Sequence, residues 1–212
     1  MHAPIRIATE KSVFAMPETA IGFFNDFTSS YFLSKIKDSI SYGLYLGLTG
    51  YRLEGKELVK WGVTTHYIET AKIPDLYEEI IEKVNADTPF EEIKAIVDSY
   101  SDNTGIDDDF NKTIEYCFQP DSIHSIKTRL VDVAAGKVPS QDQEFAEKTL
   151  DKMSKFSPIA CAIVVEHFKR VQSMSLEEAF VTEYGVSRAI FDSGEFYEGV
   201  RALLVDKDNK PK

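Results

Sequence analysis

The apolar positions of this chain follow two different periods, and the change between them comes near residue 70. Before that point, short β-prone runs occur at residues 5–8, 12–16 and 63–68. After it, apolar side chains recur every three or four residues, which is the spacing of an amphipathic helix. The pattern predicts a few short strands followed by a predominantly helical region, and therefore a mixed α/β chain.

The run at residues 12–16 precedes the most unusual part of the sequence. It is short, apolar and partly β-prone, so we interpret it as a buried strand. Pro17 has a restricted φ and no N–H to donate to a strand ladder, so the strand is predicted to end there. Glu18 then stands at a strand end, where side chains commonly face a pocket.

Polar residues and glycines mark the ends of the first predicted helices. Asp26 is a predicted N-cap for a helix that begins directly behind it. Residues 42–48 continue as a helix, for which Gly50 is a predicted C-terminal stop. Gly43 and Gly47 lie one turn apart within that helix. Because glycine lowers the stability of a helix interior, their presence predicts close packing against another segment.

Capping signals divide the remainder of the chain into further helices. Ser122 begins a predicted helix that stops at Gly136, and Ser157 begins a largely apolar one that runs to about Met174. Three pairs of residues have the spacing of a capping box: Thr88 with Glu91, Ser140 with Gln143, and Ser175 with Glu178.

Two carboxylates, Glu18 and Asp26, stand eight residues apart in an otherwise apolar, turn-containing stretch. Apolar surroundings raise the pKa of a carboxylate, which suits it for acid–base work on a neutral substrate. The alternative interpretation makes Glu18 a solvated turn acid and Asp26 only a helix cap. The residues alone favour this alternative, because most acidic side chains are not catalytic.

Composition narrows the classes of partner and cofactor. The net charge of −11 argues against a nucleic-acid-binding face. The two cysteines, Cys117 and Cys161, lack metal-ligand spacing and imply no disulfide framework, so we expect a reducing compartment and no metal site. The four histidines form no interpretable arrangement with cysteine or serine. No apolar run reaches the length of a membrane span, so no membrane association is expected.

Four stretches of the sequence resemble one enzyme family. They are residues 3–11, residues 13–22 with the run Ala15-Met16-Pro17-Glu18-Thr19, residues 44–53 and residues 198–208. Together they are similar to the 3-hydroxyisobutyryl-CoA hydrolases, a branch of the crotonase (enoyl-CoA hydratase/isomerase) superfamily. The resemblance runs nearly end to end and covers only the second part of such a protein.

The resemblance implies a fold, an activity and a location. The fold would be crotonase-like, with the last turns of a spiral of ββα units in residues 1–70 and a helical region in residues 71–212. The activity would be hydrolysis of an acyl-CoA thioester, 3-hydroxyisobutyryl-CoA, in valine breakdown. The location would be mitochondrial, and the helical region would bind a protein partner or a second copy of the chain. No cofactor is expected, because CoA is part of the substrate.

The same resemblance assigns roles to individual residues. Glu18 would be either the base that activates water or the nucleophile that attacks the thioester carbonyl. Asp26 would orient water or the substrate hydroxyl, or share the proton transfers. Lys207 or Lys210 near the C-terminus would contact the CoA phosphates, the alternative being a solvated tail.

Two features depart from the family pattern. The glycine-rich loops that form the oxyanion hole would precede Met1, so a fragment, a split gene product or a truncated gene model is expected, without thioester hydrolysis by this chain alone. Asn25 stands where the family usually has proline, and residues 27–29 stand where it has Val-Gly-Gly or similar. The alternative functions are a non-catalytic structural subunit, as in relatives found in some mitochondrial ribosomes, or one half of a split enzyme.

Overall fold

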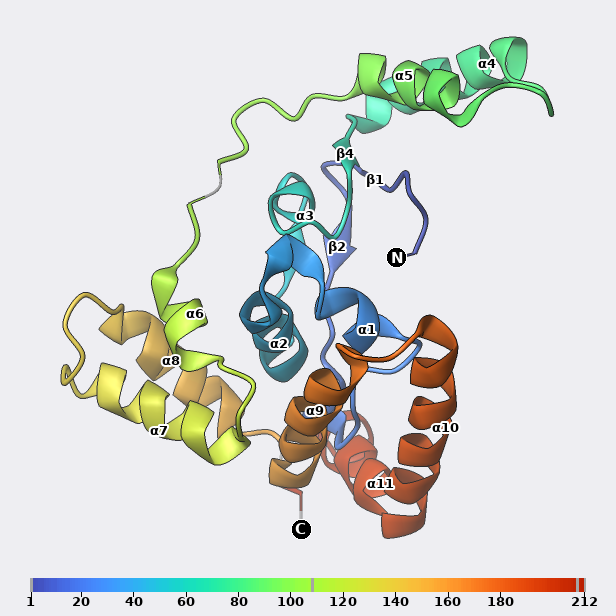
Figure 1. The fold of residues 1–212 in the computed structure, drawn as a ribbon. Helices are drawn as coiled ribbons and strands as arrows, with labels where there is room; N and C mark the ends of the chain where they lie inside the picture. The colour runs from blue at the N-terminus through green and yellow to red at the C-terminus, as the bar shows by residue number, and fades with distance from the viewer. Residues whose placement is uncertain (1, 108, 209, 212) are drawn as a thin grey trace. The chain divides into compact units, whose positions relative to one another are not determined.

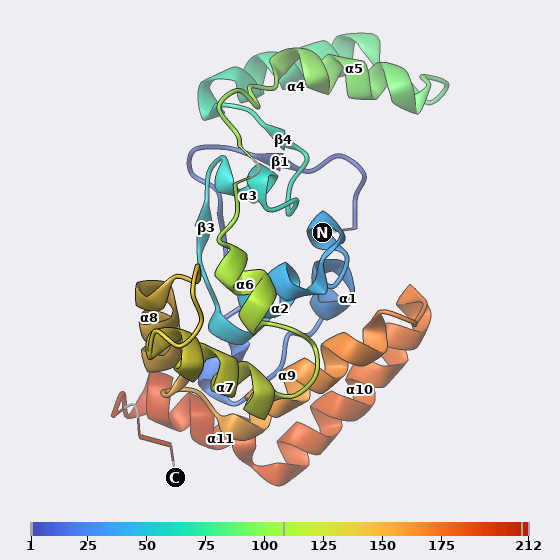
Figure 2. The ribbon, with the colours of Figure 1, turned by 60° about the vertical axis from the view of Figure 1, so that its left-hand side comes forward.

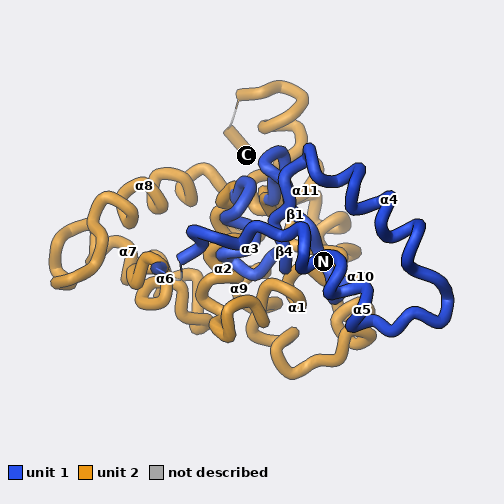
Figure 3. The backbone as a smooth tube through the Cα atoms, turned by 90° about the horizontal axis from the view of Figure 1, so that it is seen from above, with its two compact units in different colours: residues 1–14, 53–109 blue, residues 15–52, 110–212 orange. Residues whose placement is uncertain are grey.

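The computed structural model describes residues 2–107, 109–208 and 210–211. Contacts divide the chain into two compact units (Figure 3): residues 1–14 and 53–109 form unit 1, and residues 15–52 and 110–212 form unit 2. Helices dominate both units, and the strands are few and short, as the mixed α/β expectation requires. The family resemblance instead implies a division into a spiral part, residues 1–70, and a helical region, residues 71–212. That division follows the family architecture and not the contacts within this chain, and it stays a prediction.

Unit 1 contains two small strand pairs and a helical hairpin (Figure 1). Its elements are β1 (Ile7–Ala8), β2 (Val13–Phe14), β3 (Leu53–Glu54), α3 (Glu57–Lys60), β4 (His66–Tyr67), the 3₁₀ turn η3 (Thr70–Lys72), α4 (Ile73–Lys83) and α5 (Phe90–Tyr100). β1 and β4 are parallel, whereas β2 and β3 are antiparallel. The registers pair Ile7 with His66, Ala8 with Tyr67, Val13 with Glu54, and Phe14 with Leu53.

The three expected strands occur where the sequence places them, but each is only two residues long. The prediction that residues 12–16 form a buried strand is wrong in its burial. Val13 is 47% exposed and Phe14 is half-buried. β2 belongs to a two-stranded sheet, and so short a pairing buries little of its surface.

Unit 2 is built around α2 (Ile40–Thr49), in which every residue after the first is buried. The other elements are the 3₁₀ turns η1 (Glu18–Ile21) and η2 (Ile36–Asp38), the helices α1 (Ser29–Leu33), α6 (Lys112–Cys117), α7 (Ile123–Ala134), α8 (Gln143–Met153), α9 (Pro158–Val171), α10 (Leu176–Ser193) and α11 (Glu195–Val200), and the π-helical turn η4 (Arg201–Val205). Helices α9 and α10 lie side by side (Figures 1 and 2).

The glycines of α2 allow close packing, as predicted. A Cβ atom at Gly43 would lie 1.9 Å from the backbone oxygen of Leu33, so α1 approaches α2 at a point where no side chain fits. Gly50 ends the helix with a left-handed φ of 56°, a conformation that glycine adopts without strain.

Three of the predicted helix starts are confirmed. The side chains of Ser122 and Ser157 accept hydrogen bonds from backbone N–H groups of α7 and α9. Ser175 and Glu178 form a complete capping box at the start of α10. In each case the cap and its partner lie within four residues, so the local sequence is enough to determine it.

Three other predicted caps are wrong. α5 begins after Pro89, and the Thr88 hydroxyl accepts a hydrogen bond from the Asn85 N–H instead. α8 is capped by Asp142, whose side chain accepts the Phe145 N–H. α1 begins at Ser29, so Asp26 does not cap it. Phe27 and Thr28, between Asp26 and α1, have left-handed φ values, so the helix does not extend back to Asp26.

Within the described part of the chain, no helix is both long and apolar enough to span a bilayer.

Candidate active site

Glu18 is the first residue of the 3₁₀ turn η1 and follows Pro17 directly. The Phe23 N–H donates to the Glu18 carbonyl oxygen at 3.0 Å, which closes the turn. Gly22 has a φ of 68°, and a Cβ atom there would lie 2.5 Å from the backbone oxygen of Glu195. The start of α11 therefore packs directly on the turn, which leaves the turn little freedom to move.

Two buried side chains tie this stretch to α2. The Thr19 hydroxyl donates to the Leu48 carbonyl oxygen at 3.2 Å. The Asn25 amide nitrogen donates to the Gly47 carbonyl oxygen at 3.2 Å. Both side chains bond carbonyls of one helix, so the position of Glu18 is set by the core of unit 2 rather than by the turn alone.

The Glu18 carboxylate is half-buried and accepts a hydrogen bond from Asn25, with 2.9 Å between Nδ2 and Oε2. Burial raises the pKa of Glu18. Hydrogen bonds from its own backbone N–H and from Asn25 oppose that rise, and the negative charge of Asp26 adds to it. Glu18 is therefore a shielded carboxylate of raised pKa, as the acid–base hypothesis expects.

Asp26 is also half-buried, in the loop between η1 and α1. Burial raises its pKa, its own backbone N–H lowers it, and the negative charge of Glu183 raises it further. The negative charge of Asp26 contributes to the raised pKa of Glu18, after burial. Their orientation into a single pocket stays a prediction.

Glu183 of α10 is a site residue that sequence reasoning missed. It is only 4% exposed, and its Oε2 accepts the backbone N–H of Thr28 at 2.8 Å. Its Oε1 lies 3.3 Å from Nε2 of His167, which belongs to α9. Ala179, Glu183 and Ile190 share the buried face of α10, and a carboxylate on an apolar helix face is the signal that was available.

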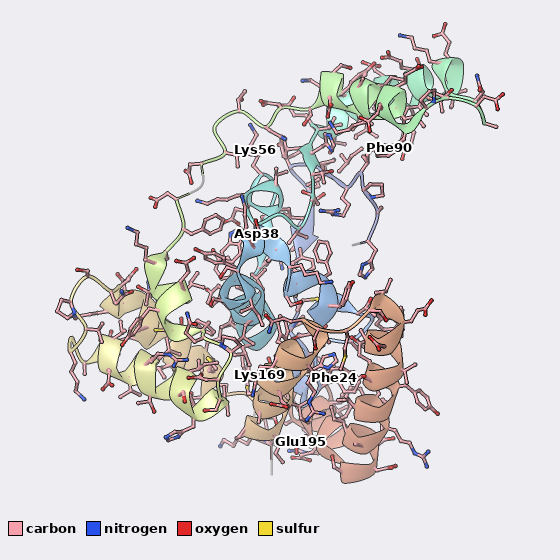
Figure 4. All side chains as sticks on the ribbon, viewed as in Figure 1. Phe24, Asp38, Lys56, Phe90, Lys169 and Glu195 are labelled. Carbon is pink, nitrogen blue, oxygen red and sulfur yellow. The ribbon has the colours of Figure 1, made fainter. Side chains whose placement is uncertain are left out.

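Aromatic side chains pack beside this buried pair. The ring of Phe24 meets His167 edge-on with 5.4 Å between centroids, where α9 and α10 come together (Figure 4). The ring of Phe23 packs against the rings of Phe191 and Phe196, with 5.6 and 5.2 Å between ring centroids. The apolar residues between Glu18 and Asp26 thus anchor the loop in the helices of unit 2.

Lys207 lies beyond η4 in an exposed segment with a left-handed φ of 56°. The neighbouring residues Asp206 and Asp208 both pair with Arg201, at 2.5 and 2.9 Å. Arg201 also donates to the carbonyl oxygen of Lys210, so the acidic flanks of Lys207 are held in a folded turn. A contact between Lys207 and CoA phosphates stays a prediction.

The raised pKa of Glu18 predicts a pH-dependent effect of Glu18→Gln on stability. Folded chain binds this proton more tightly than unfolded chain, whose carboxyl has a pKa of about 4.3. Protonation of Glu18 therefore adds to the free energy of unfolding. This stabilisation is fully present below the pKa of Glu18 in the unfolded chain, and it is lost as the pH rises through the pKa of Glu18 in the folded chain. Glu18→Gln should therefore raise Tm at pH 7, and the gain should shrink towards pH 4.

Thermal melts of both proteins across this pH range measure the effect. A matched exposed variant, Glu144→Gln in α8, should show no comparable trend. A Tm gain for Glu18→Gln that is the same at pH 4 and pH 7 would contradict a raised pKa.

Chemically, the site offers two carboxylates, Glu18 and Asp26, whose pKa values burial raises, and such carboxylates suit general acid–base chemistry. Among the described residues, no three His, Cys, Asp or Glu side chains are placed so that they could hold one metal ion.

Comparison with known families relates this geometry to a chemistry. The family model described as enoyl-CoA hydratase/isomerase matches residues 1–212. The 3-hydroxyisobutyryl-CoA hydrolase, mitochondrial, of Gallus gallus is 37% identical over 213 residues, covering 100% of this chain and 54% of its own length. The protein of the same name from Homo sapiens is 33% identical with the same coverage. The chain thus spans about half the length of the curated relatives it matches.

Solved structures agree in fold. A carnitinyl-CoA dehydratase from Mycobacterium thermoresistibile has a TM-score of 0.78 at 27% identity, over 97% of this chain and 56% of its own. An enoyl-CoA hydratase from Rhodobacter sphaeroides 2.4.1 has a TM-score of 0.70 at 27% identity, over 100% and 57%. The fold of this chain is crotonase-like, as the sequence resemblance implied.

Proposed function

Because this chain belongs to the enoyl-CoA hydratase/isomerase family, we propose that it carries the acid pair of an acyl-CoA thioester hydrolase acting on 3-hydroxyisobutyryl-CoA. The observation that carries the proposal is the half-buried Glu18 carboxylate, whose pKa burial raises, in a chain whose relatives bear that enzyme name. The match spans 54% of the chicken relative, and the experiment below therefore supplies the remaining part from that relative.

In this proposal Glu18 takes a proton from water, and the resulting oxygen nucleophile attacks the thioester carbonyl carbon. The tetrahedral intermediate then collapses, the C–S bond breaks, and CoA leaves as a thiolate that takes up a proton. Asp26 orients the water or the substrate hydroxyl and shares these proton transfers. Direct attack by Glu18 on the carbonyl is the covalent alternative, in which water hydrolyses the anhydride that forms.

Partners and location follow from the same proposal. The substrate is an acyl-CoA, with Lys207 as a candidate for the CoA phosphates. The named relatives are mitochondrial, and we propose the same location here, with valine breakdown as the setting. Val181 and Tyr184 on α10 are 75% and 74% exposed, which supports a protein partner or a second copy on the helical region.

The experiment uses a chimera in which this chain replaces the matching part of the chicken relative. Incubated with 3-hydroxyisobutyryl-CoA and a thiol reagent, the chimera should release free CoA, whereas the chicken protein without its matching part should not. Mass spectrometry of the same chimera with an enoyl-CoA tests for hydration. Hydration without CoA release would make the site a hydratase, and a folded chimera inactive in both assays would favour the non-catalytic structural role.

A further inference from the structure

Asn25 is a fully buried polar residue beside the proposed catalytic carboxylate. Its side chain is 0% exposed, and its Nδ2 lies 2.9 Å from Glu18 Oε2 and 3.2 Å from the Gly47 carbonyl oxygen. One amide nitrogen therefore links the acid to the central helix α2.

The two partners determine which end of the amide faces Glu18. Both are oxygen acceptors, a carboxylate and a backbone carbonyl. A rotated amide would set its own oxygen against both of them, without a hydrogen to share. The NH₂ group of Asn25 therefore faces Glu18, and it donates.

The fold makes room for this residue at a cost in stability. A Cβ atom at Gly47 would lie 2.5 Å from Asn25 Oδ1 and 3.0 Å from the ring of Phe168, so only glycine leaves space for the amide. Asn25 Oδ1 is buried, and none of the residues that the structure describes donates a hydrogen bond to it. An unsatisfied buried acceptor destabilises a fold, so this oxygen offsets part of the stability that the two hydrogen bonds of Nδ2 contribute.

A donor to a carboxylate stabilises its charged form and limits its rotation. Burial acts on Glu18 in the opposite direction, and a hydrolytic base must be ionised to take a proton. We propose that Asn25 is a positioning residue that keeps the Glu18 carboxylate ionised and in one orientation, so that Glu18 acts as base or nucleophile and not as proton donor. This inference rests on the proposed function for its mechanistic meaning, and on the contacts of Asn25 for its test.

The test is a ¹³C NMR titration of glutamate carboxyl groups in the 212-residue chain, with the Glu18 signal assigned by its loss in Glu18→Gln. Asn25→Ala should raise the pKa of Glu18 by about one to two pH units, because it removes a hydrogen bond that stabilises the charged carboxylate. Asn25→Pro, which also lacks a side-chain donor, is a second variant in which the pKa of Glu18 should shift in the same direction.

Thr19→Val is the matched control. It removes a buried hydrogen bond from the same turn to the same helix, but it leaves the donor to Glu18 in place. The Glu18 pKa should not move in this variant. An unchanged Glu18 pKa in a folded Asn25 variant, or an equal rise in Thr19→Val, would overturn the proposal.

The catalytic consequence is measured separately in the chimera. Asn25→Ala should move the acidic limb of the kcat/KM profile to higher pH by the shift that NMR records. An inactive chimera with an intact NMR shift would refute the hydrolase function and leave Asn25 as the group that sets the ionisation of Glu18. An active chimera whose acidic limb does not move would refute the positioning role.

Discussion

Glu18→Gln in the chimera is expected to lower kcat for thioester hydrolysis by a factor of about 10²–10⁴, the usual contribution of a positioned general base. Glutamine keeps the size of the side chain and an oxygen that can accept the Asn25 hydrogen bond, but it cannot take a proton from water. KM should change little, because the lost interaction belongs to the transition state.

Release of CoA at saturating and subsaturating substrate measures both constants. Glu144→Gln, an exposed acid of α8, is the control and should leave both constants unchanged. If Glu18→Gln retained the full kcat while the variant stayed folded, Glu18 would be neither base nor nucleophile.

Glu183→Ala is expected to lower the free energy of unfolding by roughly 1–3 kcal/mol, the cost of leaving a buried hydrogen-bonding group without its partner. The truncation leaves the Thr28 N–H without its acceptor and His167 without its carboxylate, both in the interior. Thr28 has a left-handed φ of 56°, so the loss falls on a strained loop that carries Asp26.

Denaturant unfolding of the purified chain measures this effect. Glu183→Gln keeps an acceptor for Thr28 and should cost much less, while lowering the pKa of Asp26 because it removes the negative charge that raises it. Glu177→Ala, an exposed acid on the same helix, serves as control. An equal loss in Glu183→Ala and Glu177→Ala would show that the buried pair does not stabilise the loop.

The candidate site was predictable only in its sequence-local part. Pro17 and Glu18 mark a turn in the sequence, and Glu18 does begin η1, but β2 ends at Phe14, so the prediction that the strand runs up to Pro17 is wrong. Asp26 looked like a helix cap, yet α1 begins three residues later, because the backbone takes left-handed φ values at Phe27 and Thr28. Those values occur where Glu183, 155 residues further along the chain, accepts the Thr28 N–H.

The sequence by itself determined where several helices begin and end, and that strands are few. Ser122, Ser157 and Ser175 cap their helices, and Gly50 stops α2, because each of these signals acts through hydrogen bonds or φ values within a few residues. The same locality explains why a period of three to four apolar positions was enough to predict a mainly helical chain.

Only the tertiary structure decided how the site is held. Asn25 reads as a departure from a family pattern, but in the fold its amide joins Glu18 to the Gly47 carbonyl, in space that exists because residue 47 lacks a Cβ atom. Glu183 reads as one more helical acid, but it is buried against the loop of Asp26. Such contacts join residues distant in the sequence, and the burial that gives them their energy arises only when α2, α9 and α10 pack together.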